Sequence, residues 1–179
     1  MADLLSDAEV LAFVRRGYHI VSPGCGPAVH AAAVAQAEAV VPSPVLDGFV
    51  QCPALLEVCR DERVVGALTS LAGEGYALEV HGARHYVEAG QGGQSQHQDG
   101  QWRRFGGWNR HHARRWHLPR KLMCFYYPHD VVSAPSEVVP GSQYFLTMTP
   151  ELEADAEALL VPAGSCAPPP NRGPRPNAE

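Results

Sequence analysis

The chain has 179 residues, 45% of them hydrophobic and 18% charged, a composition typical of one soluble globular domain. The formal net charge of −5 provides no global attraction to nucleic acid or to an anionic membrane. The first residues carry no basic charge, and no apolar run is long enough to span a membrane, so we expect a cytoplasmic protein. Five cysteines without CxxC spacing indicate reduced thiols rather than disulfides or a zinc site.

The N-terminal part of the sequence predicts helices, because apolar residues recur at helical spacing between capping residues and Gly or Pro. Ser6 or Asp7 can cap the first helix, Gly17 can end it, and a short edge strand follows over residues 18–21. We expect the helices to pack on the outside of a sheet. Their predicted ranges are 7–16, 27–41, 53–60 and 62–72.

Strands are predicted further along, where apolar and aromatic residues are bounded by turn residues, at 76–80, 84–87, 121–127 and 137–139. Arg84 and Tyr86 would share one face of their strand because side chains two residues apart point the same way. If that face lines a barrel, these two residues are candidates for contacts with a co-substrate. The alternative is a surface arginine beside a half-buried tyrosine.

Two metal-ligand residue types, His97 and Asp99, lie two residues apart in the polar stretch Gln94–Trp102. On an extended segment their imidazole and carboxylate converge on one point, and Gln98 turns to the other face. One histidine and one carboxylate make up two of the three ligands in the facial triad of non-haem Fe(II) oxygenases. A polar loop without a metal is the alternative.

The residues downstream favour the metal interpretation, because the aromatic strand 121–127 ends at Pro128 and Val138-Val139-Pro140-Gly141-Ser142 comes after it. HxD, aromatic strand and VVPGS in this order, within residues 17–145, resemble the phytanoyl-CoA dioxygenase-like family of Fe(II)/2-oxoglutarate-dependent oxygenases. The resemblance implies an α+β fold, a double-stranded β-helix (jelly-roll or cupin-like) with flanking N-terminal helices. It also implies that His97 and Asp99 bind Fe(II), with 2-oxoglutarate as the co-substrate.

The sequence departs from the family pattern in several places. Gln143 follows the PGS turn where the family usually has His, and Ala134 precedes Pro135 where the family usually has Gly. The family's second iron-binding His and its 2-oxoglutarate-binding Arg come on later strands, whereas the last histidine here is His129. We expect residues 146–161 to be helical, so that the barrel lacks its last strands. The expected organisation is an incomplete oxygenase-like domain over 1–161 and a disordered Pro-rich tail over 162–179.

By resemblance, the chain would hydroxylate a small-molecule substrate, with activity impaired by the missing His and Arg. Arg84, Tyr86 and Gln98 are the candidates for contacts with the co-substrate. One alternative is a truncated or frame-shifted, non-catalytic product, because a Gly/Pro/Ala/Arg-rich tail is typical of an out-of-frame reading of a GC-rich gene. Another is a binding module that uses residues 103–121.

Residues 103–121 are basic and aromatic: they hold half of the chain's Lys and Arg and no Asp or Glu. The segment could attract an anionic substrate, such as an acyl-CoA or a carboxylate, to the mouth of the site. It could also be a groove for single-stranded nucleic acid, or a solvated loop without a partner. We expect a small-molecule substrate, anionic if this segment binds it, in preference to nucleic acid. A zinc site at His111 and His112 is not favoured, because no Cys or carboxylate partner has the required spacing.

Overall fold

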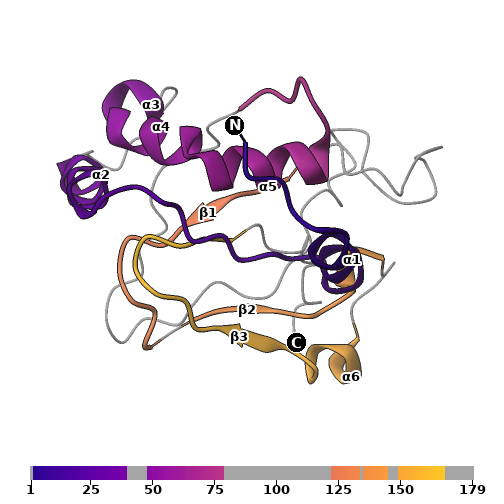
Figure 1. Cartoon of the computed structure of the whole chain (residues 1–179). Coiled ribbons are helices and arrows are strands. Elements are labelled where there is room, and N and C mark those ends of the chain that lie inside the picture. The colour runs from indigo at the N-terminus through magenta and orange to yellow at the C-terminus, as the bar shows by residue number, and fades with distance from the viewer. Residues whose placement is uncertain (1, 40–47, 79–121, 134, 145–148, 168–179) are drawn as a thin grey trace, which may run out of the picture.

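The computed structural model describes residues 2–39, 48–78, 122–133, 135–144 and 149–167 (Figure 1). The described part is an α+β arrangement of helices and two small antiparallel sheets. Its helices are α1 (Asp7–Arg16), α2 (Pro27–Ala39), α3 (Gly48–Gln51), α4 (Pro53–Arg60), α5 (Glu62–Ala72), the 3₁₀ turn η2 (Ser142–Tyr144) and α6 (Pro150–Glu153). Its strands are β1 (Phe125–Tyr126), β2 (Ser136–Val138), β3 (Glu157–Leu159) and β4 (Cys166–Ala167).

The bounds of α1 follow from its two caps, as the sequence predicts. Ser6 and Glu9 form a capping box, in which the Ser6 N–H donates to the Glu9 carboxylate at 2.8 Å. At the other end Gly17 adopts a left-handed φ of 84°, and its N–H donates to the Phe13 carbonyl at 2.6 Å. Local chemistry therefore sets both ends of this helix, and the predicted range 7–16 is confirmed.

The next helices are joined by polar contacts to the backbone. Asp61 caps α5 by accepting from the Arg63 N–H at 3.0 Å, and its other carboxylate oxygen accepts from the Gly24 N–H at 2.9 Å. At the start of α4, the Gln36 side chain of α2 accepts from the Ala54 N–H at 2.9 Å. The predicted helices 53–60 and 62–72 are confirmed, and α2 ends at Ala39, with residues 40–47 outside the described part.

The N-terminal segment runs against α5. The Asp3 N–H donates to the Glu62 carbonyl at 3.1 Å, and the Leu5 N–H donates to the Ser70 hydroxyl at 3.0 Å. Gly66 makes this approach possible, because a Cβ atom at that position would overlap the backbone of Asp3. The start of the chain is thereby fixed along the helix.

The two sheets pair strands that lie far apart in sequence. β1 pairs with β4, with Phe125 opposite Ala167, and β2 pairs with β3, with Glu137 opposite Ala158. Val21 forms a bridge to Cys166 on the other side of β4, with hydrogen bonds of 2.7 and 2.8 Å. The edge strand predicted at 18–21 is therefore present as this single bridge.

β1 is shorter than the strand predicted over residues 121–127, and the sequence of its partner explains why. Tyr127 and Ser165 form one rung of the ladder, with an N–H···O distance of 2.9 Å, and Phe125 lies opposite Ala167. Two prolines, Pro168 and Pro169, follow Ala167 directly in the sequence. Proline has no N–H to donate, so the sequence predicts that β4, and with it β1, is short.

Two predictions in the C-terminal half are corrected by the structure. Residues 146–161 are not one helix: α6 ends at Glu153, and β3 begins at Glu157. Leu159 and Val161 are buried with Val138 and Tyr18, so packing against β2 outweighs the helix propensity of the Glu-Ala-Leu-Leu sequence. Cys166 and Ala167, at the start of the predicted Pro-rich tail, form β4, and residues 168–179 lie outside the described part. Residues 76–78 of the strand predicted at 76–80 are irregular.

Two clusters of buried side chains make up the core. One lies between α5 and the β1–β4 sheet, where Val58, Val64 and Ala67 pack against Val21 and Cys166. The other surrounds the β2–β3 sheet and includes Tyr18, Val138 and Leu159. Figure 1 shows α4 and α5 above β1, with β2 and β3 on the far side of it. Within the ranges that the structure describes, none of the helices has the length and apolar character needed to cross a membrane.

Candidate functional site

The predicted iron ligands His97 and Asp99 lie outside the described residues, in the segment 79–121. The predicted co-substrate contacts Arg84, Tyr86 and Gln98 lie in the same segment, as do the basic and aromatic residues 103–121. The segment comes after Leu78, shortly after α5, and the described chain resumes at Leu122, three residues before β1. The described parts nearest to it in sequence are therefore the end of α5 and the strand β1, which contribute to one core cluster.

A small apolar cavity of about 10 Å³, roughly the space of one water molecule, lies between α5 and the sheet. α5 lines it with Val64, Ala67, Leu68 and Leu71, and the sheet side contributes His19, Val21, Cys124 and Cys166. The cavity has no polar wall apart from the imidazole and thiol groups. Burial lowers the pKa of His19, while the carboxylate of Glu9 opposes that shift. The neutral imidazole is thus the form that this cavity favours.

The VVPGS segment forms a short strand followed by a turn. Val138 and Val139 are buried, and the turn after them needs glycine because Gly141 has a φ of 78°. The Gly141 N–H donates to the Arg16 carbonyl at 2.9 Å, so the turn is held against the end of α1. Gln143, directly after this turn, donates from its amide nitrogen to the Val14 carbonyl at 2.9 Å. Its side chain therefore also links the turn to α1.

His30 on α2 and Tyr126 on β1 form a polar contact that no pattern in the sequence predicts. The His30 Nδ1 and the Tyr126 hydroxyl are 2.8 Å apart, and the two rings stack with centroids 5.9 Å apart. Burial, with a smaller contribution from Cys166, raises the pKa of Tyr126 to about 12. The phenol therefore stays protonated at neutral pH. Helical and strand periodicity carry no information about a pair that spans residues 30 to 126.

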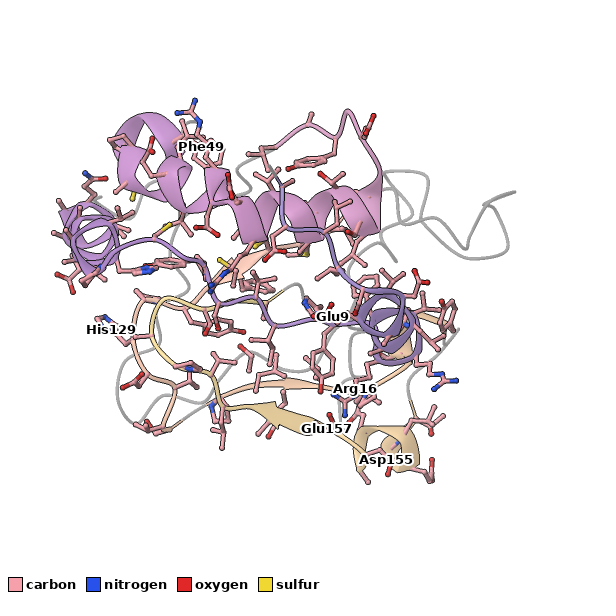
Figure 2. All side chains as sticks on the ribbon, viewed as in Figure 1. Glu9, Arg16, Phe49, His129, Asp155 and Glu157 are labelled. Atoms are coloured by element: carbon pink, nitrogen blue, oxygen red, sulfur yellow. The ribbon has the colours of Figure 1, made fainter. Side chains whose placement is uncertain are left out.

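Tyr18 joins the second sheet to the N-terminal segment. Its hydroxyl donates to the Glu157 carboxylate at 2.7 Å, and the Arg16 guanidinium lies 5.7 Å from its ring centroid. Figure 2 shows Arg16 and Glu157 near each other beside β3. Burial, followed by the hydrogen bond to Glu157, raises the pKa of Tyr18. This contact links the buried Tyr18 to the exposed residues Arg16 and Glu157. It contains one carboxylate and no His or Cys side chain, so it does not form a metal site.

The described residues do not themselves supply a metal centre. Among them, no group of three or more His, Cys, Asp or Glu side chains is placed to hold a metal ion. His129, the last histidine of the chain, is exposed on the loop after β1 (Figure 2). The proposed ligands therefore remain the imidazole of His97 and the carboxylate of Asp99.

Comparison with protein families, with curated proteins and with solved structures found no match to this chain.

Proposed function

We propose that this chain is an Fe(II)/2-oxoglutarate-dependent oxygenase-like domain, related to the phytanoyl-CoA dioxygenase-like family, with His97 and Asp99 as iron ligands. The observation that carries the proposal is the HxD sequence followed by the strand and PGS turn of β2 and Gly141. An imidazole nitrogen and a carboxylate oxygen are a donor set that suits Fe(II). The substrate would be a small molecule, and residues 103–121 would favour an anionic one.

The order of strand pairing supports a double-stranded β-helix as the underlying fold. β1 pairs with β4, and β2 pairs with β3 inside that pair, all antiparallel. A jelly roll has this nested order, because it can be viewed as one long antiparallel hairpin that is wound up, so that the outermost strands meet each other. Helices α4 and α5 cover one sheet, as expected for the flanking N-terminal helices (Figure 1).

The residues assigned to the proposed centre are His97 and Asp99, one imidazole and one carboxylate. Fe(II) binds weakly to simple donor sets and depends on the protein for geometry. When bound, the iron would supply the oxidising chemistry and 2-oxoglutarate the electrons, while the protein would position both and exclude water.

Anaerobic titration with Fe(II) and 2-oxoglutarate tests this proposal. A metal-to-ligand charge-transfer absorption band is expected when both are present, and His97→Ala or Asp99→Ala should abolish it. His129→Ala is the matched control, because this exposed histidine lies outside the proposed centre. A wild-type protein that shows no band, or a band that persists in both ligand variants, would disprove the proposed site.

A non-catalytic binding role is the second candidate, and one observation favours it. Pro168 and Pro169 follow β4 directly in the sequence, and because proline has no N–H to donate, the sequence does not favour a longer strand there. In this case residues 103–121 would bind an anionic ligand without iron chemistry. Binding of a medium-chain acyl-CoA that survives the combined His97→Ala and Asp99→Ala changes would support this role over the first.

A further inference from the structure

Two thiols meet at the end of the β1–β4 ladder. Cys166 is in β4 opposite Tyr126, and Cys124 is two residues before Tyr126, so Cys124 and Cys166 are on the same face of the sheet. Both line the apolar cavity under α5. Cys166 is buried, with 2% of its surface exposed, whereas Cys124 is an exposed residue. One residue of the pair thus reaches the surface, and the other is enclosed in the core.

The side chains of Cys124 and Cys166 lie close enough to affect each other. Interaction with the Cys166 side chain lowers the pKa of Cys124, and interaction with Cys124, followed by burial, raises the pKa of Cys166. Because Cys124 is the exposed residue of the two, it is the cysteine that a peroxide from solution meets first, and a cysteine attacks as its thiolate.

We propose that Cys124 and Cys166 form a redox-responsive pair, in which Cys124 reacts with a peroxide and Cys166 resolves the product as a disulfide. The Cys124 thiolate attacks hydrogen peroxide, an S–O bond forms, the O–O bond breaks, and hydroxide leaves and is protonated to water. The Cys166 sulfur then loses its proton and forms the S–S bond, while the S–O bond breaks and a second water leaves. Both sulfurs are oxidised, and the peroxide is reduced to two waters.

The backbone around Cys124 leaves room for the bond to form. Diagonal residues across an antiparallel pair lie about 7–8 Å apart, slightly more than the Cα separation of about 4.4–6.8 Å that disulfides prefer. The regular ladder ends at Phe125 and Ala167, so Cys124 lies one residue beyond it. The described ladder pairs no residue with Cys124, so a backbone shift at this end of β1 can bring the two sulfurs together.

A third thiol, that of Cys59 on α4, lies close enough to Cys124 to influence it, and its properties make it a poor competitor. Burial, followed by the nearby Cys124, raises the pKa of Cys59 to about 12. Cys59 is thus almost entirely protonated at neutral pH and does not attack peroxide efficiently. It also belongs to α4, whereas Cys166 is in β4 and Cys124 directly precedes the partner strand β1.

Peptide mapping of the full chain after peroxide treatment tests the proposal. The protein is treated with hydrogen peroxide, free thiols are blocked with N-ethylmaleimide, and the digest is analysed without reduction by mass spectrometry. We expect a peptide pair linked through Cys124 and Cys166 in the wild type. In Cys166→Ser, we expect a dimedone adduct on Cys124 in place of the link.

The control is Cys52→Ser, because Cys52 is buried elsewhere and its thiol contacts the Ala33 carbonyl at 3.6 Å. The Cys124–Cys166 link should form in this variant as in the wild type. A link from Cys124 to Cys59, or a wild-type map in which Cys124 stays alkylated while other thiols are oxidised, would overturn the proposal. The wild-type map decides this even if Cys166→Ser fails to fold.

Discussion

His19 puts an ionisable group against an apolar wall, next to α5. Its pKa is lowered from 6.5 by burial, so the unfolded chain takes up a proton at a higher pH than the folded chain does. The stability that the neutral imidazole provides is therefore present above about pH 6.5 and is lost as the pH falls from there through the lowered folded-state pKa. Lowering the pH should therefore weaken the contact between α5 and the β1–β4 sheet.

The measurement is the midpoint of urea unfolding at pH 7.5 and at pH 5.5, for the wild type and for His19→Gln. The wild type should lose more stability between the two pH values than the variant, because glutamine does not titrate. All other histidines are common to both proteins and cancel in the comparison. An equal loss in both proteins would show that His19 does not contribute.

Gly164 is a second position at which a single added carbon atom should change the stability of the protein. It has a φ of 81°, and a Cβ atom there would lie 2.8 Å from the His30 ring, which is itself held by Tyr126. Gly164→Ala should lower the free energy of unfolding by the cost of left-handed backbone, about 1–2 kcal/mol, and by about 1–3 kcal/mol more for overpacking. Gly75→Ala is the control for the backbone cost, because Gly75 has a φ of 78° and nothing within 4 Å of its would-be Cβ.

Chemical denaturation of both glycine variants separates the two effects. Gly75→Ala should show the backbone cost alone, and the difference between the variants measures how tightly His30 packs over the turn. Equal losses would mean that the His30 ring moves aside without cost, and the contact with Tyr126 would then not be a rigid one.

At the scale of elements, two prolines follow β4 directly in the sequence, and we expect them to end that strand because proline has no N–H to donate. Pro169→Val restores an N–H at the position that the register places opposite Met123. One additional ladder hydrogen bond should raise the free energy of unfolding by about 0.5–1.5 kcal/mol, and protection of the Met123 region from hydrogen exchange should increase. Pro174→Val, in the same Pro-rich stretch but remote from that register, is the control. No change in Pro169→Val would show that some other feature ends the strand.

The elements also show which kinds of structure the sequence could predict. Both ends of α1 were predicted correctly because Ser6, Glu9 and Gly17 act within a few residues of the helix. β3 was predicted as helix because Glu157, Ala158 and Leu159 have helical propensity, and only their pairing with β2 makes them extended. The length of β1 depended in the same way on the sequence of a partner near residue 166.

At the scale of the whole molecule, the candidate site shows the same difference. Features set by neighbouring residues could be predicted, and contacts between distant segments could not. The HxD residues His97 and Asp99 could be proposed from local spacing alone, and they lie outside the described residues. The groups that the structure does bring together, His30 with Tyr126 and Cys124 with Cys166, come from distant segments and could not be predicted from any local pattern. The mixed α+β class was accessible from the sequence, since the resemblance implies it and the periodicity predicts both helices and strands.

The pairing of Val21 with Cys166, and of Phe125 with Ala167, has a consequence for how the protein is made. During synthesis, α1 to α5 can form as soon as they leave the ribosome, but neither partner of β4 can close until residue 167 has emerged. The apolar side of α5 therefore waits for almost the entire chain before it is covered, and contacts of such long sequence separation form slowly. We expect the nascent chain to depend on chaperones through most of its translation.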